Sequence, residues 1–234
     1  MNREIILDTE TTGLSPEAGH RVIEIGCVEM VGRRLTGRRF HTYINPERDI
    51  DPGAMQVHGI TNERVAAEPV FARIIDEFVD FIRDGELVIH NAAFDVGFLN
   101  AEFGRLDRGK VADLCDSVVD TLKLAREMRP GKRNSLDALC KDFGIDNSGR
   151  QLHGALLDAE LLSEVYLAMT RGQDSLMMDL DSPSAAVAAV PVGERAPLRV
   201  LRASEEELAE HEAVLQQIAK ESKGKCLWLA ESGG

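Results

Sequence analysis

The chain has 234 residues, of which 44% are hydrophobic and 5% aromatic, and its formal net charge is −13 with a pI near 4.9. This length suits one α/β domain with an appendage and an aliphatic core, and no apolar run reaches the roughly 20 residues of a membrane span. The acidic balance argues against a nucleic-acid binder that works by a basic surface alone, although bound metal ions can supply positive charge locally.

The first 170 residues or so alternate strand-like and helix-like segments, which predicts a mixed sheet with helices on its faces. A connection at 31–38, with two glycines, is predicted to join the second and third strands as a hairpin. The predicted strands are 5–7, 21–30, 39–46, 86–91 and 116–121.

Helical spacing of apolar residues predicts helices at 70–83 and 155–169, and a helix over 93–103 is considered for the segment after the fourth strand. Asn134 is the predicted N-cap of a further helix in "SLDALCKDF". The four cysteines are scattered without CxxC spacing, and the N-terminus "MNREII" lacks a secretory signal. Together these features predict reduced thiols in a cytoplasmic protein.

The composition changes after "TRGQ". Residues 181–197 contain three prolines and many small residues, which predicts a linker. Beyond the linker we expect a short strand and an acidic helix, with Ser204 and Glu207 forming a capping box. This tail of about 30 residues is too small to form a core alone, so we expect it to fold against a partner.

Four acids lie at the edges of apolar elements. Asp8 and Glu10, in "LDTETTG", leave the first strand on the same face because they are two residues apart. Asp95 and Asp158 each lie on the apolar face of a predicted helix, where an unpaired carboxylate is costly. Considered singly, each acid is more readily explained as a buried residue whose carboxylate caps a helix or pairs with an arginine.

Together the four acids indicate a metal site. Carboxylates suit Mg²⁺ or Mn²⁺, and two such ions about 3.5–4 Å apart serve in-line displacement at phosphorus. His153 precedes Gly154 just before the helix of Asp158, so we expect it on a loop above the metal. Its near-neutral pKa range suits a general base for the attacking water.

Three motifs, "DTETTG", "HNAAFDVGFL" and "HGALLDAE", resemble those of the DEDD superfamily of 3′–5′ exonucleases, in the branch whose third motif carries His. The likeness extends over residues 4–178 and 198–230 to the proofreading members that serve bacterial replicative DNA polymerases. The resemblance implies a ribonuclease-H-like α/β fold: a mixed five-stranded sheet flanked by helices, with a C-terminal linker and a partner-docking tail.

The resemblance also implies an exodeoxyribonuclease that releases nucleoside 5′-monophosphates with two divalent cations. Asp8, Glu10 and Asp158 would ligate metal, with Asp8 shared between the ions and Asp95 acting through water, while His153 would activate the nucleophile. The implied pocket for the 3′-terminal nucleotide consists of Asp8, Thr9, Glu10, Thr11, Gly13, Val57, His58, Phe94 and Asp158.

By the same resemblance, residues 1–172 are the exonuclease domain and residues 198–234 dock on the polymerase subunit, with Trp228 as an apolar anchor. Residues 173–180 contain a clamp-binding peptide, Gln173–Met178, although Met178 stands where an aromatic residue is usual.

Two alternatives remain open at this stage. An RNA-trimming exonuclease of the same superfamily would use the same site but has little use for the linker and tail. A tethered structural subunit with an idle site would be expected to lack one of the acids or the histidine, and all five positions are filled.

Overall fold

The computed structural model describes residues 3–150, 152–171 and 203–222. The chain divides into two compact units, Met1–Asp181 and Ser182–Gly234, which are described separately. Among the described residues, no helix has both the length and the apolar character needed to cross a membrane.

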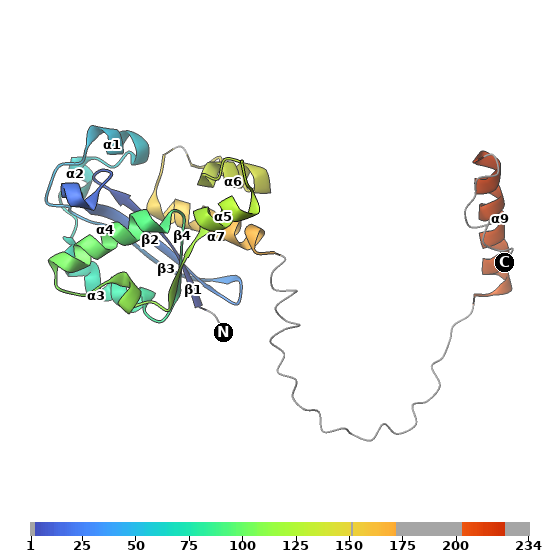
Figure 1. Cartoon of the computed structure of the whole chain (residues 1–234), viewed down its shortest axis with the longest axis horizontal. Coiled ribbons are helices and arrows are strands. Elements are labelled where there is room, and N and C mark those ends of the chain that lie inside the picture. The colour runs from blue at the N-terminus through green and yellow to red at the C-terminus, as the bar shows by residue number, and fades with distance from the viewer. Residues whose placement is uncertain (1–2, 151, 172–202, 223–234) are drawn as a thin grey trace, which may run out of the picture. The chain divides into compact units, whose positions relative to one another are not determined.

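The first unit is built on a five-stranded mixed sheet with strand order β3-β2-β1-β4-β5 (Figure 1). β1 pairs antiparallel with β2, which pairs antiparallel with β3, whereas β1, β4 and β5 run parallel. The predicted mixed five-stranded sheet is therefore confirmed. The strands are β1 (Arg3–Thr11), β2 (Val22–Val31), β3 (Arg34–Tyr43), β4 (Glu86–Ile89) and β5 (Ser117–Asp120).

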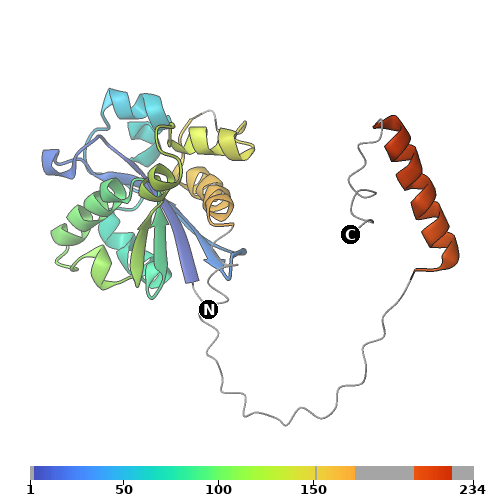
Figure 2. The same ribbon diagram turned by 45° about the vertical axis from the view of Figure 1, so that its right-hand side comes forward.

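Helices cover both faces of the sheet, as the edge-on view of Figure 2 shows. Alternation along β1 sends Ile5 and Leu7 into the core under α3 and α4, and Ile6 into the core under α5, α6 and α7. The helices are α1 (Pro52–His58), α2 (Asn62–Val65), α3 (Phe71–Ile82), α4 (Ala92–Arg105), α5 (Thr121–Met128), α6 (Leu136–Phe143) and α7 (Ala155–Met169), with 3-10 turns η1 (Pro16–Ala18) and η2 (Val111–Asp113).

Two local predictions were wrong. β3 begins at Arg34 because the hairpin turn needs only Gly32 and Arg33, both at positive φ, which suits a two-residue turn. The N-cap of α6 is Ser135, whose Oγ accepts a hydrogen bond from Ala138 N (3.4 Å), while the Asn134 side chain donates to the Lys132 carbonyl.

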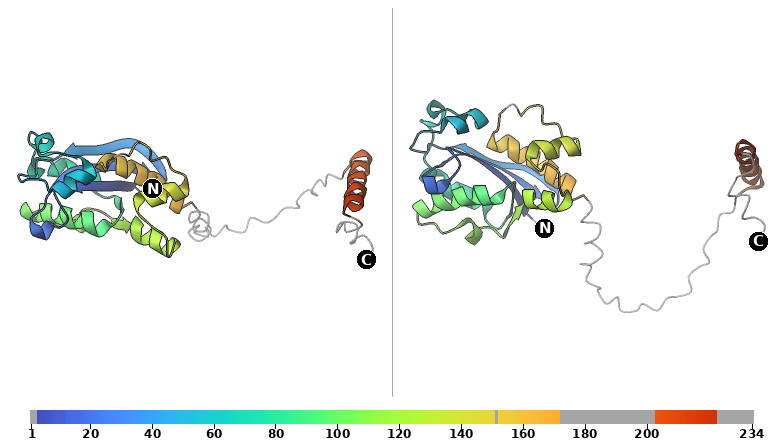
Figure 3. Two further views of the ribbon diagram at one scale, coloured as in Figure 1. Left: turned by 90° about the horizontal axis from the view of Figure 1, so that it is seen from above. Right: turned by 45° about the horizontal axis from the view of Figure 1, so that its top comes forward.

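The second unit contains the helix α9 (Glu205–Glu221), coloured red in both views of Figure 3. The predicted capping box is confirmed: Ser204 Oγ accepts from Glu207 N, and the Glu207 carboxylate accepts from Ser204 N. The predicted clamp peptide, the linker, the short strand near 198 and Trp228 lie outside the described residues.

Candidate active site

Two acids at the end of β1 face the same helices as Ile6. They are Asp8, which is half-buried, and Glu10, which is buried, and they follow Ile6 in the two-residue alternation of the strand. Asp158, in the first turn of α7, is buried on this side of the sheet. One ligand atom from each of Glu10, His153 and Asp158 lies within 4.8 Å of the others. Three of the five predicted catalytic residues thus form a group that fits around one metal ion.

Asp95 reaches the same end of β1 from the first turn of α4. Its Oδ1 accepts hydrogen bonds from Thr9 N (3.1 Å) and Thr9 Oγ1 (2.7 Å). Because Thr9 lies between Asp8 and Glu10, these two bonds hold Asp95 next to the other acids, and its charge raises the pKa of both Asp8 and Glu10. The structure therefore gathers all four predicted acids.

Burial and neighbouring acids raise the pKa values of Asp8 and Glu10. Burial is the largest cause that raises the pKa of Asp8 well above its ordinary range, followed by the charges of Asp95, Glu10 and Asp158. Burial also raises the pKa of Glu10 to about 8 and that of Asp95 to about 7. Crowded, poorly hydrated carboxylates are stabilised when a cation takes the place of water. This set of oxygen donors suits a hard divalent cation.

The start of α7 lies directly on β2, and this contact depends on Gly26. A Cβ at Gly26 would come within 2.3 Å of the Ala155 carbonyl carbon, so a side chain cannot fit there. Glu24 Oε2 accepts a hydrogen bond from Ala155 N (3.2 Å), one of the amides that a helix start leaves free. Gly26 pairs with Asp8 in the sheet, so the contact sets Asp158 against β1.

The sequence reasoning missed Arg150, which contacts the acids from the loop before α7. Its side chain is only 6% exposed. Its Nε and Nη2 each lie 2.5 Å from an oxygen of Asp158, and its Nη1 donates to Asp137 Oδ1 (2.6 Å). Its position in the sequence could have indicated this role, because Arg150 stands three residues before His153.

His153 lies on the loop before α7, as predicted, and Gly154 is the N-cap of that helix. Its backbone N donates to the carbonyl of Val57 (3.2 Å), which ties the loop to α1. The ring Nδ1 lies 3.5 Å from Asp158 Oδ2, and the side chain is 45% exposed. His153 therefore stands at the rim of the acidic group, where a substrate and a water molecule can reach it.

Two hollows share part of their walls at this site. The larger, about 670 Å³, is lined by the four acids and His153, and also by Arg126 and Lys132. The smaller, about 470 Å³, is lined by seven of the nine residues predicted for the terminal nucleotide; Asp8 and Asp158 line the larger one. Those seven are Thr9, Glu10, Thr11, Gly13, Val57, His58 and Phe94.

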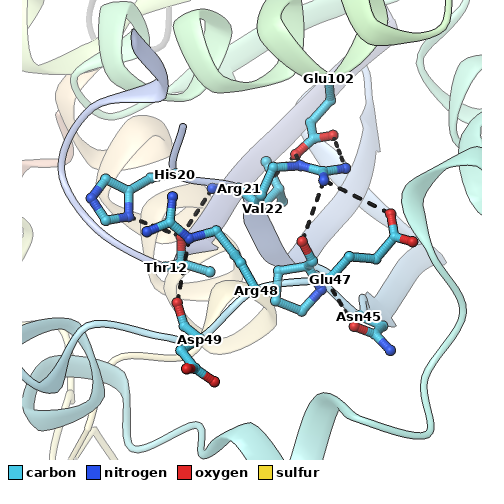
Figure 4. Close-up of polar contacts among 10 residues, drawn as sticks. Thr12, His20, Arg21, Val22, Asn45, Glu47, Arg48, Asp49 and Glu102 are labelled. Carbon is cyan, nitrogen blue, oxygen red and sulfur yellow. Dashed lines mark hydrogen bonds and ion pairs between the residues drawn. The ribbon is translucent and has the colours of Figure 1, made fainter. Parts of the chain in front are cut away.

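Polar contacts that the sequence did not predict hold the loop after β1 (Figure 4). Thr12 Oγ1 accepts from Arg21 N (3.0 Å) and lies 3.0 Å from His20 Nδ1. Arg21 makes a bidentate ion pair with the buried Glu102 of α4 (2.6 and 2.8 Å). The His20 ring lies against Gly13, where a Cβ would meet it at 2.3 Å. This network fixes the backbone that lines the smaller hollow.

The comparisons with known proteins agree with this site. The exonuclease family model RNase_T matches residues 5–166, which include all four acids and His153. The DNA polymerase III subunit epsilon of Salmonella typhimurium is 52% identical over 98% of both chains. The chain belongs to the exonuclease family of DNA polymerase III epsilon subunits. Its predicted class, an exonuclease that acts with a DNA polymerase, is confirmed.

Solved structures of other exonucleases share the fold of this epsilon-family chain. Exonuclease X in complex with 5′ overhanging duplex DNA is 27% identical, with a TM-score of 0.55, over 73% of this chain and 92% of that one. The nuclease domain of 3′hExo, a DEDDh family member bound to rAMP, has a TM-score of 0.63 at 22% identity, again over 73% and 92%. The expected ribonuclease-H-like fold is therefore confirmed.

Proposed function

We propose that this chain removes nucleotides from the 3′ end of DNA and thereby proofreads for the replicative polymerase. The observation that carries the proposal is the grouping of Asp8, Glu10, Asp95 and Asp158 at one end of β1, beside a hollow lined by the residues expected to hold a terminal nucleotide. The name of the Salmonella relative supports a DNA polymerase as the partner and DNA as the substrate.

We propose that the acids hold two divalent cations, Mg²⁺ or Mn²⁺. Asp8, Glu10 and Asp158 would be ligands, with Asp8 shared between the ions, and Asp95 would act through water. When bound, the cations neutralise charge on the attacking and leaving oxygens of a phosphodiester. The raised pKa values of Asp8 and Glu10 support this assignment, because they indicate carboxylates whose charge Arg150 offsets only in part.

The remaining residues bind the chain end and move a proton. Val57 and Phe94 offer apolar faces to the terminal sugar and base, and His58 and the backbone from Thr9 to Gly13 surround the same nucleotide. His153 accepts a proton from water while the water oxygen bonds to phosphorus. The bond from phosphorus to O3′ of the preceding nucleotide breaks, O3′ takes up a proton from solvent, and the terminal nucleotide leaves as a 5′-monophosphate.

We assign the chemistry to residues 1–172 and docking on the polymerase subunit to residues 198–234, which residues 181–197 connect. The peptide Gln173–Met178, within 173–180, is the proposed contact with the sliding clamp. These assignments place the protein in the cytoplasm, at the replisome. The polymerase named in the Salmonella relative supports the partner but not the segment that binds it.

Degradation of a 3′-labelled DNA strand with Mg²⁺, beside the matching RNA strand, tests the proposal. We expect release of 5′-monophosphates from DNA by the full chain and no release by Asp158→Ala. Asp80→Ala removes an exposed acid of α3 instead and should act like the wild type. Faster loss of the RNA strand would favour the RNA-trimming alternative. A wild-type protein that hydrolyses neither strand would show an idle site and refute the proposal.

A further inference from the structure

Arg150 pairs with both oxygens of Asp158. Its Nε and Nη2 form a two-pronged ion pair with both carboxylate oxygens (2.5 Å each), and this pair is almost fully shielded from water, at 6% and 4% side-chain exposure. A planar guanidinium matches a carboxylate in this geometry better than any other side chain does. A divalent cation that binds Asp158 would share an oxygen with the guanidinium, so the two positive groups would repel each other at one carboxylate and compete for it.

Arg150 also contacts the proposed base. Its Nη2 lies 3.0 Å from His153 Nδ1, and because a guanidinium can only donate, Nδ1 is the acceptor in this bond. A ring that accepts this bond carries its proton on Nε2, so Nδ1 cannot take a proton from water while the bond persists. One side chain therefore restrains both a metal ligand and the base.

The guanidinium has a second partner to hold it after release. Nη1 donates to Asp137 Oδ1 (2.6 Å), and Asp137, at the start of α6, is 60% exposed, whereas Asp158 is buried. Arg150 also lines the larger hollow together with the acids. A small rotation toward Asp137 would keep its charge paired while freeing Asp158.

We propose that Arg150 is a positioning residue that competes with the divalent cation for Asp158 and couples metal binding to the release of His153. Before metal binds, the guanidinium neutralises part of the acidic group and keeps Asp158 and His153 in place. When metal binds, Arg150 leaves both residues, so the base becomes free only in the loaded site. This inference rests on the metal site of the proposed function.

Mn²⁺ binding to the full chain, measured by titration calorimetry, tests the competition without any substrate. We expect Arg150→Gln to lower the Kd for Mn²⁺ by about tenfold, a size usual for groups in one ion-pair network. Arg126→Gln removes a cation that lines the same hollow and should change the Kd by less than about twofold. An unchanged or higher Kd in Arg150→Gln would mean that Arg150 merely supports the fold, and would overturn the proposal.

A second measurement follows the His153 ring. In the metal-free wild type, nitrogen NMR should show His153 with its proton on Nε2, and Mg²⁺ should change this signal. Arg150→Lys keeps the charge but loses the two-pronged pair, so it serves if Arg150→Gln does not fold and should also bind Mn²⁺ more tightly than the wild type. A wild type that takes up no Mn²⁺ would refute the metal site itself. Uptake by the wild type with no gain in either variant would refute only the role of Arg150.

Discussion

Replacing Gly26 by alanine tests whether the contact between β2 and α7 sets the geometry of the acidic group. The new Cβ would lie 2.3 Å from the Ala155 carbonyl carbon and from Leu156 N, whereas ordinary contact begins near 3.4 Å. Both neighbours are backbone atoms, so no side chain can turn aside. The start of α7 must therefore move by about 1 Å, the difference between those two distances.

The displacement acts on Asp158, which lies in the first turn of α7. Misplacing a reacting group by about 1 Å costs roughly 10²-fold in rate, or about 2.7 kcal/mol in the activation free energy. Overpacking of this kind also lowers the free energy of unfolding by about 1–3 kcal/mol, which corresponds to about 2–4 °C in Tm for each kcal/mol in a chain of this size.

The assay is the release of labelled nucleotides from a DNA strand at saturating Mg²⁺, with a thermal melt of the same sample. Gly104→Ala is the matched control, because Gly104 lies in α4 and no atom stands within 4 Å of a Cβ built there. This control should keep its activity and gain up to about 1 kcal/mol in stability. If Gly26→Ala is folded and hydrolyses DNA within about twofold of the wild-type rate, the contact does not set the site.

Three further outcomes are expected. His153→Ala should lower the hydrolysis rate by about 10²–10⁴-fold while calorimetry still detects Mn²⁺ uptake; an unchanged rate would exclude His153 as the base. The pKa of Glu10 is raised to about 8, so the folded state keeps a proton that the unfolded chain releases above its ordinary pKa of 4.5. Stability in EDTA should therefore fall as the pH rises between these values, by up to about 1.4 kcal/mol per pH unit; urea titrations should show a smaller fall in Glu10→Gln, and an equal fall would contradict the assignment. Deleting residues 198–234 should leave nuclease activity intact but abolish co-purification with the polymerase subunit, and retained co-purification would place docking elsewhere.

The local sequence predicted most helices and strands, because the patterns that indicate them extend over only a few residues. The capping box of Ser204 and Glu207 and the helix at 155–169 were both found this way. The prediction failed where two neighbouring residues are equally suited to begin a helix, as at Asn134 and Ser135, which are both good N-caps. The choice between them depends on which side chain reaches the free amides of α6, and that geometry follows from packing.

The sequence by itself determined which groups are proposed for the chemistry, because two acids on one strand face and two on apolar helix faces are costly unless a cation offsets their charge. Only the tertiary structure decided how those groups are held. Gly26 lets α7 approach β2, Glu102 meets Arg21 across the loop after β1, and Arg150 takes both oxygens of Asp158. In the first two contacts the partners are far apart in the chain. All three contacts depend on how the helices, strands and loops pack together, and no pattern of neighbouring residues specifies that packing.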